Sequence, residues 1–135
     1  MRLLKMRHLL AVLLALGILA LPVACQKTPE PAPITIALPA ALSNGKITLA
    51  EFGSNSCIPC REMKPILEDL ANMYDSQLNV VIIDVYEQKA LTQQYGILGI
   101  PTQIVFDSSG KEVTRHVGVW SLSSILVQLR SLGLT

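Results

Sequence analysis

The sequence has few residues that bind metal ions and no surplus of positive charge. It has three cysteines and two histidines among 135 residues. These five residues do not supply four ligands with any spacing that structural zinc sites use, which excludes such a site. Three of the 11 basic residues and none of the 10 acidic ones lie within residues 1–24, so the remainder has 8 basic and 10 acidic residues and a formal charge of −2. Because no basic patch remains, we expect no binding to nucleic acid.

Residues 1–24 have the pattern of a signal peptide. A basic segment precedes an apolar run, residues 9–23, that carries no charge and is short for a transmembrane helix. Ala24 and Cys25 follow, and a small residue before a cysteine at this point resembles the bacterial lipoprotein signal. In that family the cysteine is lipidated and becomes the new N-terminus. Cleavage near Ala24 without a lipid and an uncleaved anchor are the alternatives, and all three send the domain out of the cytoplasm.

A proline-rich segment separates this leader from the rest of the chain. Its prolines favour an extended chain and disfavour a helix, so residues 25–44 are predicted to be a tether carrying the lipid at Cys25. One helical turn within residues 40–46 is an alternative. The folded domain is predicted to span residues 45–135, which is enough for one domain with its own core. The prolines of the tether are Pro29, Pro31, Pro33 and Pro39.

Hydrophobic periodicity predicts an α/β domain with a central mixed sheet of about four to five strands flanked by helices. Strands joined through helices are expected to run parallel, and a hairpin across residues 107–110 adds an antiparallel partner. The predicted order is strand 47–53, helix 58–74, strand 78–85, helix 88–95, strand 102–106, strand 112–117 and helix 121–132.

Two cysteines, Cys57 and Cys60, stand between the first strand and the first long helix. A cysteine at the start of a helix meets unpaired N–H groups and the positive end of the helix dipole, which favour its thiolate. Cys57 is therefore predicted to be the attacking thiolate. Cys60, which is expected to face the domain, is predicted to be the resolving thiol. The alternative is a structural disulfide, but closing so short a loop stabilises a fold little.

The domain resembles the thioredoxin family over about residues 45–133. Two positions depart from the family pattern. Ser56 stands where the family usually has Trp, and Glu51 stands where many members have a buried Asp. The resemblance is carried by Phe52, by Cys57-Ile58-Pro59-Cys60-Arg61 with Met63 and Pro65, by Gly96-Ile97-Leu98-Gly99-Ile100-Pro101-Thr102, by Phe106 to Gly110 and by Gly118.

The resemblance implies roles for further residues. Pro101 would be the cis-proline beside the cysteines, and the backbone of Ile100 would pair with an extended substrate; a trans proline at the start of an edge strand is the alternative. Glu51 would accept the proton of Cys60, since burial raises the pKa of a carboxyl group; the alternative is that Glu51 faces outward. Ser56, Ile58 and Pro59 would border the substrate.

Three other residues are predicted to have no part in catalysis. Arg61 and Lys64 are interpreted as solvated charges on a helix face. His116 is expected on the exposed side of the fourth strand.

The resulting hypothesis is a thiol–disulfide oxidoreductase that reduces protein disulfides outside the cytoplasm. Its motifs resemble in sequence those of membrane-tethered, extracytoplasmic bacterial thioredoxins. The usual electron donor of those proteins is a transmembrane thiol conduit of the cytochrome-c-biogenesis type. We expect a monomeric lipoprotein on the periplasmic side of the membrane, without a cofactor. A disulfide oxidase or isomerase is one alternative. The other is a module that binds Cu(I) through Cys57 and Cys60, whose soft thiolates suit that ion.

Overall fold

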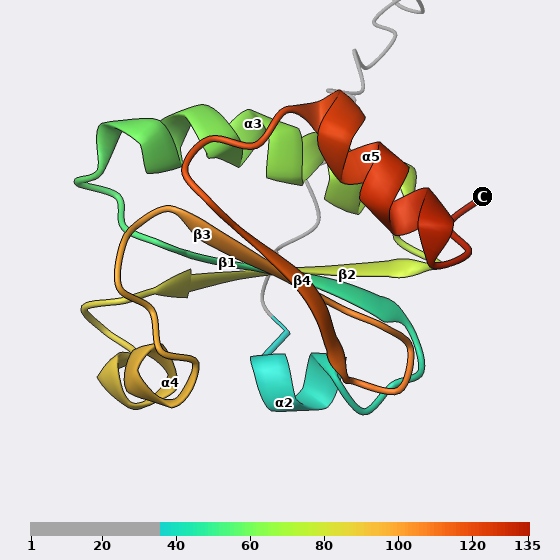
Figure 1. Cartoon of the computed structure of the whole chain (residues 1–135), viewed down its shortest axis with the longest axis horizontal. Helices are drawn as coiled ribbons and strands as arrows, with labels where there is room; N and C mark the ends of the chain where they lie inside the picture. Colours follow the sequence, from blue (N-terminus) through green and yellow to red (C-terminus); the bar gives the residue numbers. More distant parts are fainter. Residues whose placement is uncertain (1–35) are drawn as a thin grey trace, which may run out of the picture. The chain divides into compact units, whose positions relative to one another are not determined.

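The computed structural model describes residues 36–135, which form an α/β fold around a four-stranded sheet (Figure 1). The predicted signal peptide, Cys25 and most of the predicted tether lie outside the described residues. Within residues 36–135, no helix is both long and apolar enough to cross a membrane. The elements are α2 (Leu38–Ala41), β1 (Ile47–Gly53), α3 (Ile58–Met73), β2 (Leu78–Asp84), α4 (Lys89–Gln94), β3 (Thr102–Phe106), β4 (Glu112–Val117) and α5 (Leu122–Ser131).

The sheet is mixed, as predicted, with the strand order β2-β1-β3-β4. β1 pairs with β2 in parallel and with β3 antiparallel, and β3 and β4 form the predicted hairpin. The expectation that β3 runs parallel to the strand before it is wrong. A helix as short as α4 rises only about 9 Å, whereas a strand as long as β2 extends for about 23 Å. The chain therefore does not return along the sheet, and β3 begins at the edge where β2 ends (Figure 1).

Helices cover both faces of the sheet. α3 and α5 lie over one face, and α2 and α4 lie over the other (Figure 1). The first core cluster packs beneath α3 and α5 and includes Leu49, Leu67 and Val105; the second packs on the opposite face and includes Phe52 and Ile104. Because β1 and β3 are the central strands, every residue of both is buried. The described residues thus carry a complete core of their own.

Helix α2 corrects the predicted start of the domain. Leu38 is 2% exposed and Ala41 is 0% exposed, so the fold begins well before residue 45. Pro39 was expected to prevent a helix, but it lies in the first turn of α2, where the missing N–H has no partner to lose. Asn79 of β2 donates hydrogen bonds to the Ala41 carbonyl at 3.0 Å and to Thr48 Oγ1 at 3.1 Å. This buried amide joins α2 to the two parallel strands.

Candidate active site

Several loops meet at one edge of the sheet. β1, β2 and β4 end at this edge and β3 begins there. Phe52 near the end of β1 pairs with Thr102 at the start of β3. The turn that carries Cys57 therefore lies beside the Pro101 segment. The Gly118 amide donates a hydrogen bond of 2.8 Å to the Pro101 carbonyl. The end of β4 therefore also lies beside the Pro101 segment.

Cys57 caps the N-terminus of α3. A tight turn after β1 delivers it there, with the Cys57 amide donating to the Ser54 carbonyl at 3.1 Å. Pro59 occupies the first helical turn, where its fixed φ favours a helix start. Cys57 Sγ accepts a hydrogen bond of 3.2 Å from the Cys60 amide. The sulfur thus replaces the usual side-chain oxygen of an N-cap and lies at the positive end of the helix dipole.

Cys57 and Cys60 form a disulfide with a Cα–Cα distance of 5.3 Å. The two residues differ in exposure, because Cys57 is half-buried and Cys60 is only 6% exposed. Ser56 and Ile58, on either side of Cys57, are exposed. Cys57 is therefore the more exposed residue of the pair, on the side from which a partner in solvent would approach.

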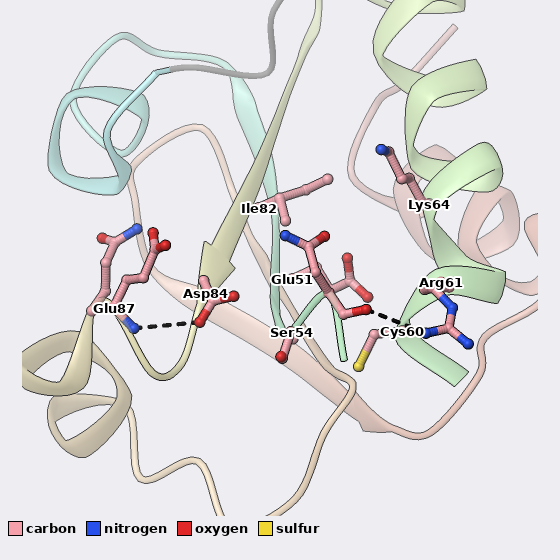
Figure 2. Close-up of a pocket in the computed structure, with 11 residues that line it drawn as sticks. Glu51, Ser54, Cys60, Arg61, Lys64, Ile82, Asp84 and Glu87 are labelled. Carbon is pink, nitrogen blue, oxygen red and sulfur yellow. Dashed lines mark hydrogen bonds between the residues drawn. The ribbon is translucent and has the colours of Figure 1, made fainter. Parts of the chain in front are cut away.

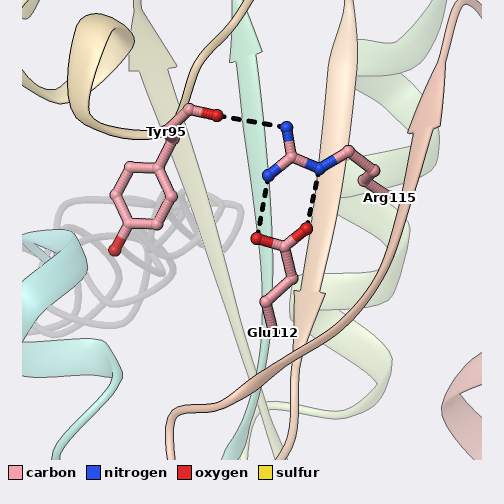
Figure 3. A network of polar contacts seen from close by, with 3 residues as sticks. All are labelled: Tyr95, Glu112 and Arg115. Carbon is pink, nitrogen blue, oxygen red and sulfur yellow. Dashed lines mark hydrogen bonds and ion pairs between the residues drawn. The ribbon is translucent and has the colours of Figure 1, made fainter.

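The Ile100–Pro101 peptide bond is cis, as the family resemblance implied. Pro101 is buried and Ile100 is half-buried. A polar network anchors the segment that leads to them (Figure 3). Arg115 of β4 holds Glu112 through two hydrogen bonds of 2.7 and 2.8 Å and donates a third, of 3.1 Å, to the Tyr95 carbonyl at the end of α4. The Tyr95 ring packs between two aromatic rings of the second core cluster, Phe52 and Phe106.

A pocket of about 300 Å³ opens beside the disulfide (Figure 2). Glu51 and Cys60 line it together with Ile82, the β2 residue that pairs with Glu51. The pocket thus connects solvent with the buried sulfur and with a buried carboxyl group. Four charged side chains lie at its border, namely Arg61, Lys64, Asp84 and Glu87.

Glu51 provides that carboxyl group. It is 2% exposed, so the alternative of an outward-facing Glu51 is wrong. Burial raises the pKa of this carboxyl group from its ordinary 4.5 to about 7, because the ionised form loses solvation. A Cβ atom added to Gly53 would lie 3.3 Å from Cys60 Sγ and 3.6 Å from Glu51 Oε1. The sulfur of Cys60 and the carboxyl group of Glu51 therefore border the same small space beside Gly53, and a carboxyl group with a pKa near 7 suits proton exchange at neutral pH.

Glu51→Gln is expected to stabilise the protein at neutral and higher pH. The folded pKa of about 7 exceeds the ordinary 4.5, so the folded state binds the extra proton and loses stability as the pH rises between these values. At about 1.4 kcal/mol per pKa unit, the gain in unfolding free energy should reach about 3 kcal/mol at pH 8 and vanish below pH 4.5. Urea unfolding across this pH range measures it, with exposed Glu62→Gln as the control. Equal gains at pH 4 and pH 8 would contradict the prediction.

Gln103 and Lys64 were not assigned to the site from the sequence. Gln103 is fully buried in β3 and is the Cα partner of Glu51. A polar residue within an apolar strand was the available signal, but only the strand register reveals its neighbour. Lys64 is exposed, as predicted, and its Nζ lies 3.9 Å from Oε1 of Glu68 on the same helix. The pocket lining nevertheless includes Lys64.

The predicted exposure of His116 is wrong. In β4 the exposed positions alternate with half-buried ones, and His116 is half-buried. Its ring stacks on that of Trp120, with 5.0 Å between the ring centroids and 18° between the planes. Within residues 36–135 no three His, Cys, Asp or Glu side chains are grouped so that they could hold a metal ion.

Known thioredoxins are similar to this chain in sequence and in fold. A sequence model of the thioredoxin family matches residues 38–131. The thioredoxin of Alicyclobacillus acidocaldarius is 34% identical over 89 residues, which are 66% of this chain and 84% of that protein. The thioredoxin of Staphylococcus saprophyticus is 36% identical over 72 residues, 53% of this chain and 68% of that protein. A mutant thioredoxin from Halobacterium salinarum superposes with a TM-score of 0.63 at 33% identity, covering 68% of this chain and 79% of that one.

Proposed function

The chain belongs to the thioredoxin family, and we propose that it reduces protein disulfides outside the cytoplasm while anchored to a membrane through Cys25. Its Cys57–Cys60 pair makes it a thiol–disulfide oxidoreductase, and thioredoxins act on proteins that contain disulfides. One observation chiefly supports this proposal: a half-buried cysteine at a helix N-terminus is linked by a disulfide to a buried cysteine beside a buried carboxyl group. This asymmetry suits a two-step exchange.

The exchange begins with the reduced dithiol. The Cys57 thiolate attacks one sulfur of the substrate disulfide, and the other substrate sulfur leaves as a thiolate and takes a proton from water. Cys60 then gives its proton to Glu51 and attacks Cys57 Sγ, so that the second substrate sulfur leaves as a thiolate and takes a proton from water, to which Glu51 releases its own. Two electrons pass to the substrate, and the Cys57–Cys60 disulfide remains. A transmembrane thiol conduit would return two electrons and two protons to the pair.

An apolar surface around the cysteines would receive the substrate. Ile58 and Val117 are each 63% exposed, and Leu98 is fully exposed. Ile58 begins α3, Leu98 lies in the loop before β3, and Val117 ends β4, so all three lie near the end of the sheet where β1 runs into the Cys57 turn. With Ser56 in place of a large aromatic side chain, the rim beside Cys57 is open and polar on one side. We propose that an extended substrate lies along Ile100 with apolar side chains against this surface.

The proposal predicts that Cys25 serves the anchor and not the chemistry. Residues 26–135 should accelerate the reduction of insulin by dithiothreitol, and the full chain with Cys25→Ser should do so equally well after losing its lipid. Metabolic labelling with a radioactive fatty acid measures the attachment, and insulin turbidity measures the turnover. The matched comparison is the unaltered full chain in detergent. If residues 26–135 had no activity, the proposed reductase function would be contradicted. If Cys25→Ser still carried lipid, only the proposed attachment at Cys25 would be contradicted.

A further inference from the structure

Gln103 and Glu51 face each other across the two central strands. They are Cα partners in the antiparallel β1–β3 pairing, and directly opposed residues place their Cβ atoms about 5 Å apart on the same face. Leu49 and Val105, two residues away along the respective strands, belong to the first core cluster. Because side chains alternate along a strand, Glu51 and Gln103 share that face, beneath α3 and α5.

Both side chains are buried with polar atoms unpaired. Gln103 is 0% exposed and Glu51 is 2% exposed. Among the described residues, neither amide atom of Gln103 has a hydrogen-bond partner, and Glu51 Oε1 also has none. Buried polar groups are rarely left in this state, because their desolvation is then uncompensated. The Gln103 amide and the Glu51 carboxyl group can hydrogen-bond each other in either protonation state. Gln103 Nε2 can donate to the carboxylate, and Gln103 Oε1 can accept from the protonated carboxyl group.

We propose that Gln103 is a positioning residue of the exchange reaction, whose side-chain amide hydrogen-bonds the Glu51 carboxyl group and readies it for the proton of Cys60. The inference rests on the proposed function, in which Glu51 accepts that proton. A hydrogen bond to an ionised acceptor is stronger than one to a neutral acceptor. Gln103 therefore favours the ionised carboxylate and opposes the rise in pKa that burial causes in Glu51.

The removal of this amide has a defined effect on proton transfer. Without the donor, Glu51 keeps its own proton to higher pH, and fewer molecules at neutral pH have a carboxylate free to accept from Cys60. Other titratable groups near Glu51 act mostly through water, because they are exposed or half-buried. They are Arg61 and Lys64 on α3, Asp84 and Glu87 at and after the end of β2, and His116 on β4, the Cα partner of Gln103.

The test compares residues 26–135 with and without Gln103→Met, an apolar change of similar shape. Met fills a similar volume, so the variant should fold, although removal of one partner of the proposed hydrogen bond should lower its stability. In the oxidised protein, the carbon-13 signal of the Glu51 carboxyl group should titrate about one pKa unit or more higher in the variant. Insulin reduction at pH 7 should slow by up to about tenfold and recover at pH 9.

Two controls isolate the pair. Gln93→Met on the exposed surface of α4 should change neither the Glu51 titration nor the turnover. In a Glu51→Gln background, Gln103→Met should leave the pH profile of turnover unchanged, because the carboxyl group on which the amide acts is absent. A double-mutant cycle with additive effects on that profile would overturn the proposal.

A measurement on the unaltered protein tests the hydrogen bond between Gln103 and Glu51 even if Gln103→Met fails to fold. The side-chain amide signals of Gln103 should shift with the same pKa as the Glu51 carboxyl carbon. If the chemical shifts of the Gln103 amide did not change as Glu51 titrates, the proposal would be overturned. Both titrations use the oxidised protein and do not depend on catalysis. A failure of the reductase function would appear instead as absent turnover in the unaltered domain.

Discussion

Cys57→Ser should abolish disulfide reduction, whereas Cys60→Ser should stop the reaction halfway and hold the substrate. Cys57 caps α3 and is the more exposed sulfur, so its loss removes the group that attacks the substrate. Cys60 is 6% exposed and lies beside Glu51, so its loss removes the group that releases the substrate from Cys57. Turnover of insulin should fall to the uncatalysed rate in both variants, but for different reasons.

Non-reducing gels distinguish the two variants. Incubation of Cys60→Ser with a disulfide-containing protein should give a mixed disulfide that dithiothreitol cleaves, and Cys57→Ser should give none. In the reduced unaltered protein, iodoacetamide at mildly acidic pH should label Cys57 first, because the helix dipole favours its thiolate. If Cys57→Ser forms the stable mixed disulfide, or if Cys60 is alkylated first, the roles of the two cysteines are reversed.

The reduction potential of the Cys57–Cys60 pair is expected near that of thioredoxin, about −270 mV, and far from that of the strong oxidants of the periplasmic disulfide-forming type, about −120 mV. A dithiol becomes more oxidising as its reduced form is more strongly stabilised. Here the two residues between the cysteines are Ile58, without a polar side chain, and Pro59, without an N–H. Cys57 Sγ accepts one hydrogen bond among the described residues, from the Cys60 amide. The helix dipole remains as the main source of thiolate stabilisation.

The two reference potentials differ by about 150 mV, which for two electrons corresponds to about 7 kcal/mol. Equilibration of residues 26–135 with glutathione buffers, followed by quantification of free thiols, resolves such a difference easily. A value above about −180 mV, that of protein disulfide isomerase, would favour an oxidase or isomerase. The matched variant Pro59→His adds a donor beside Cys57 and should raise the potential toward that of the oxidants.

The sequence alone predicted most of this fold because its long elements have clear periodicity. It also located Cys57 at a helix start, because a strand that runs into a helix fixes that position. The buried Glu51 was implied by the family resemblance and not by the periodicity, which left an outward-facing Glu51 open. It did not predict the direction of β3, which depends on whether α4 is long enough to span the sheet. Nor did it predict the burial of Gln103 against Glu51, because one sequence does not give the register between strands that are 50 residues apart.

The early start of the fold at α2 bears on the proposed membrane anchor, because it would limit how far the cysteine pair could lie from the membrane. Leu38 is fixed in the core, so only residues 26–37 would separate the proposed lipid on Cys25 from the folded domain, and twelve residues span at most about 40 Å when fully extended. With the anchor proposed above, a tether of this length would confine the thiols to a thin layer above the bilayer. Encounters with membrane-bound donors and acceptors would then occur at a raised local concentration, and substrate proteins farther from the membrane would have to diffuse to it to be reduced.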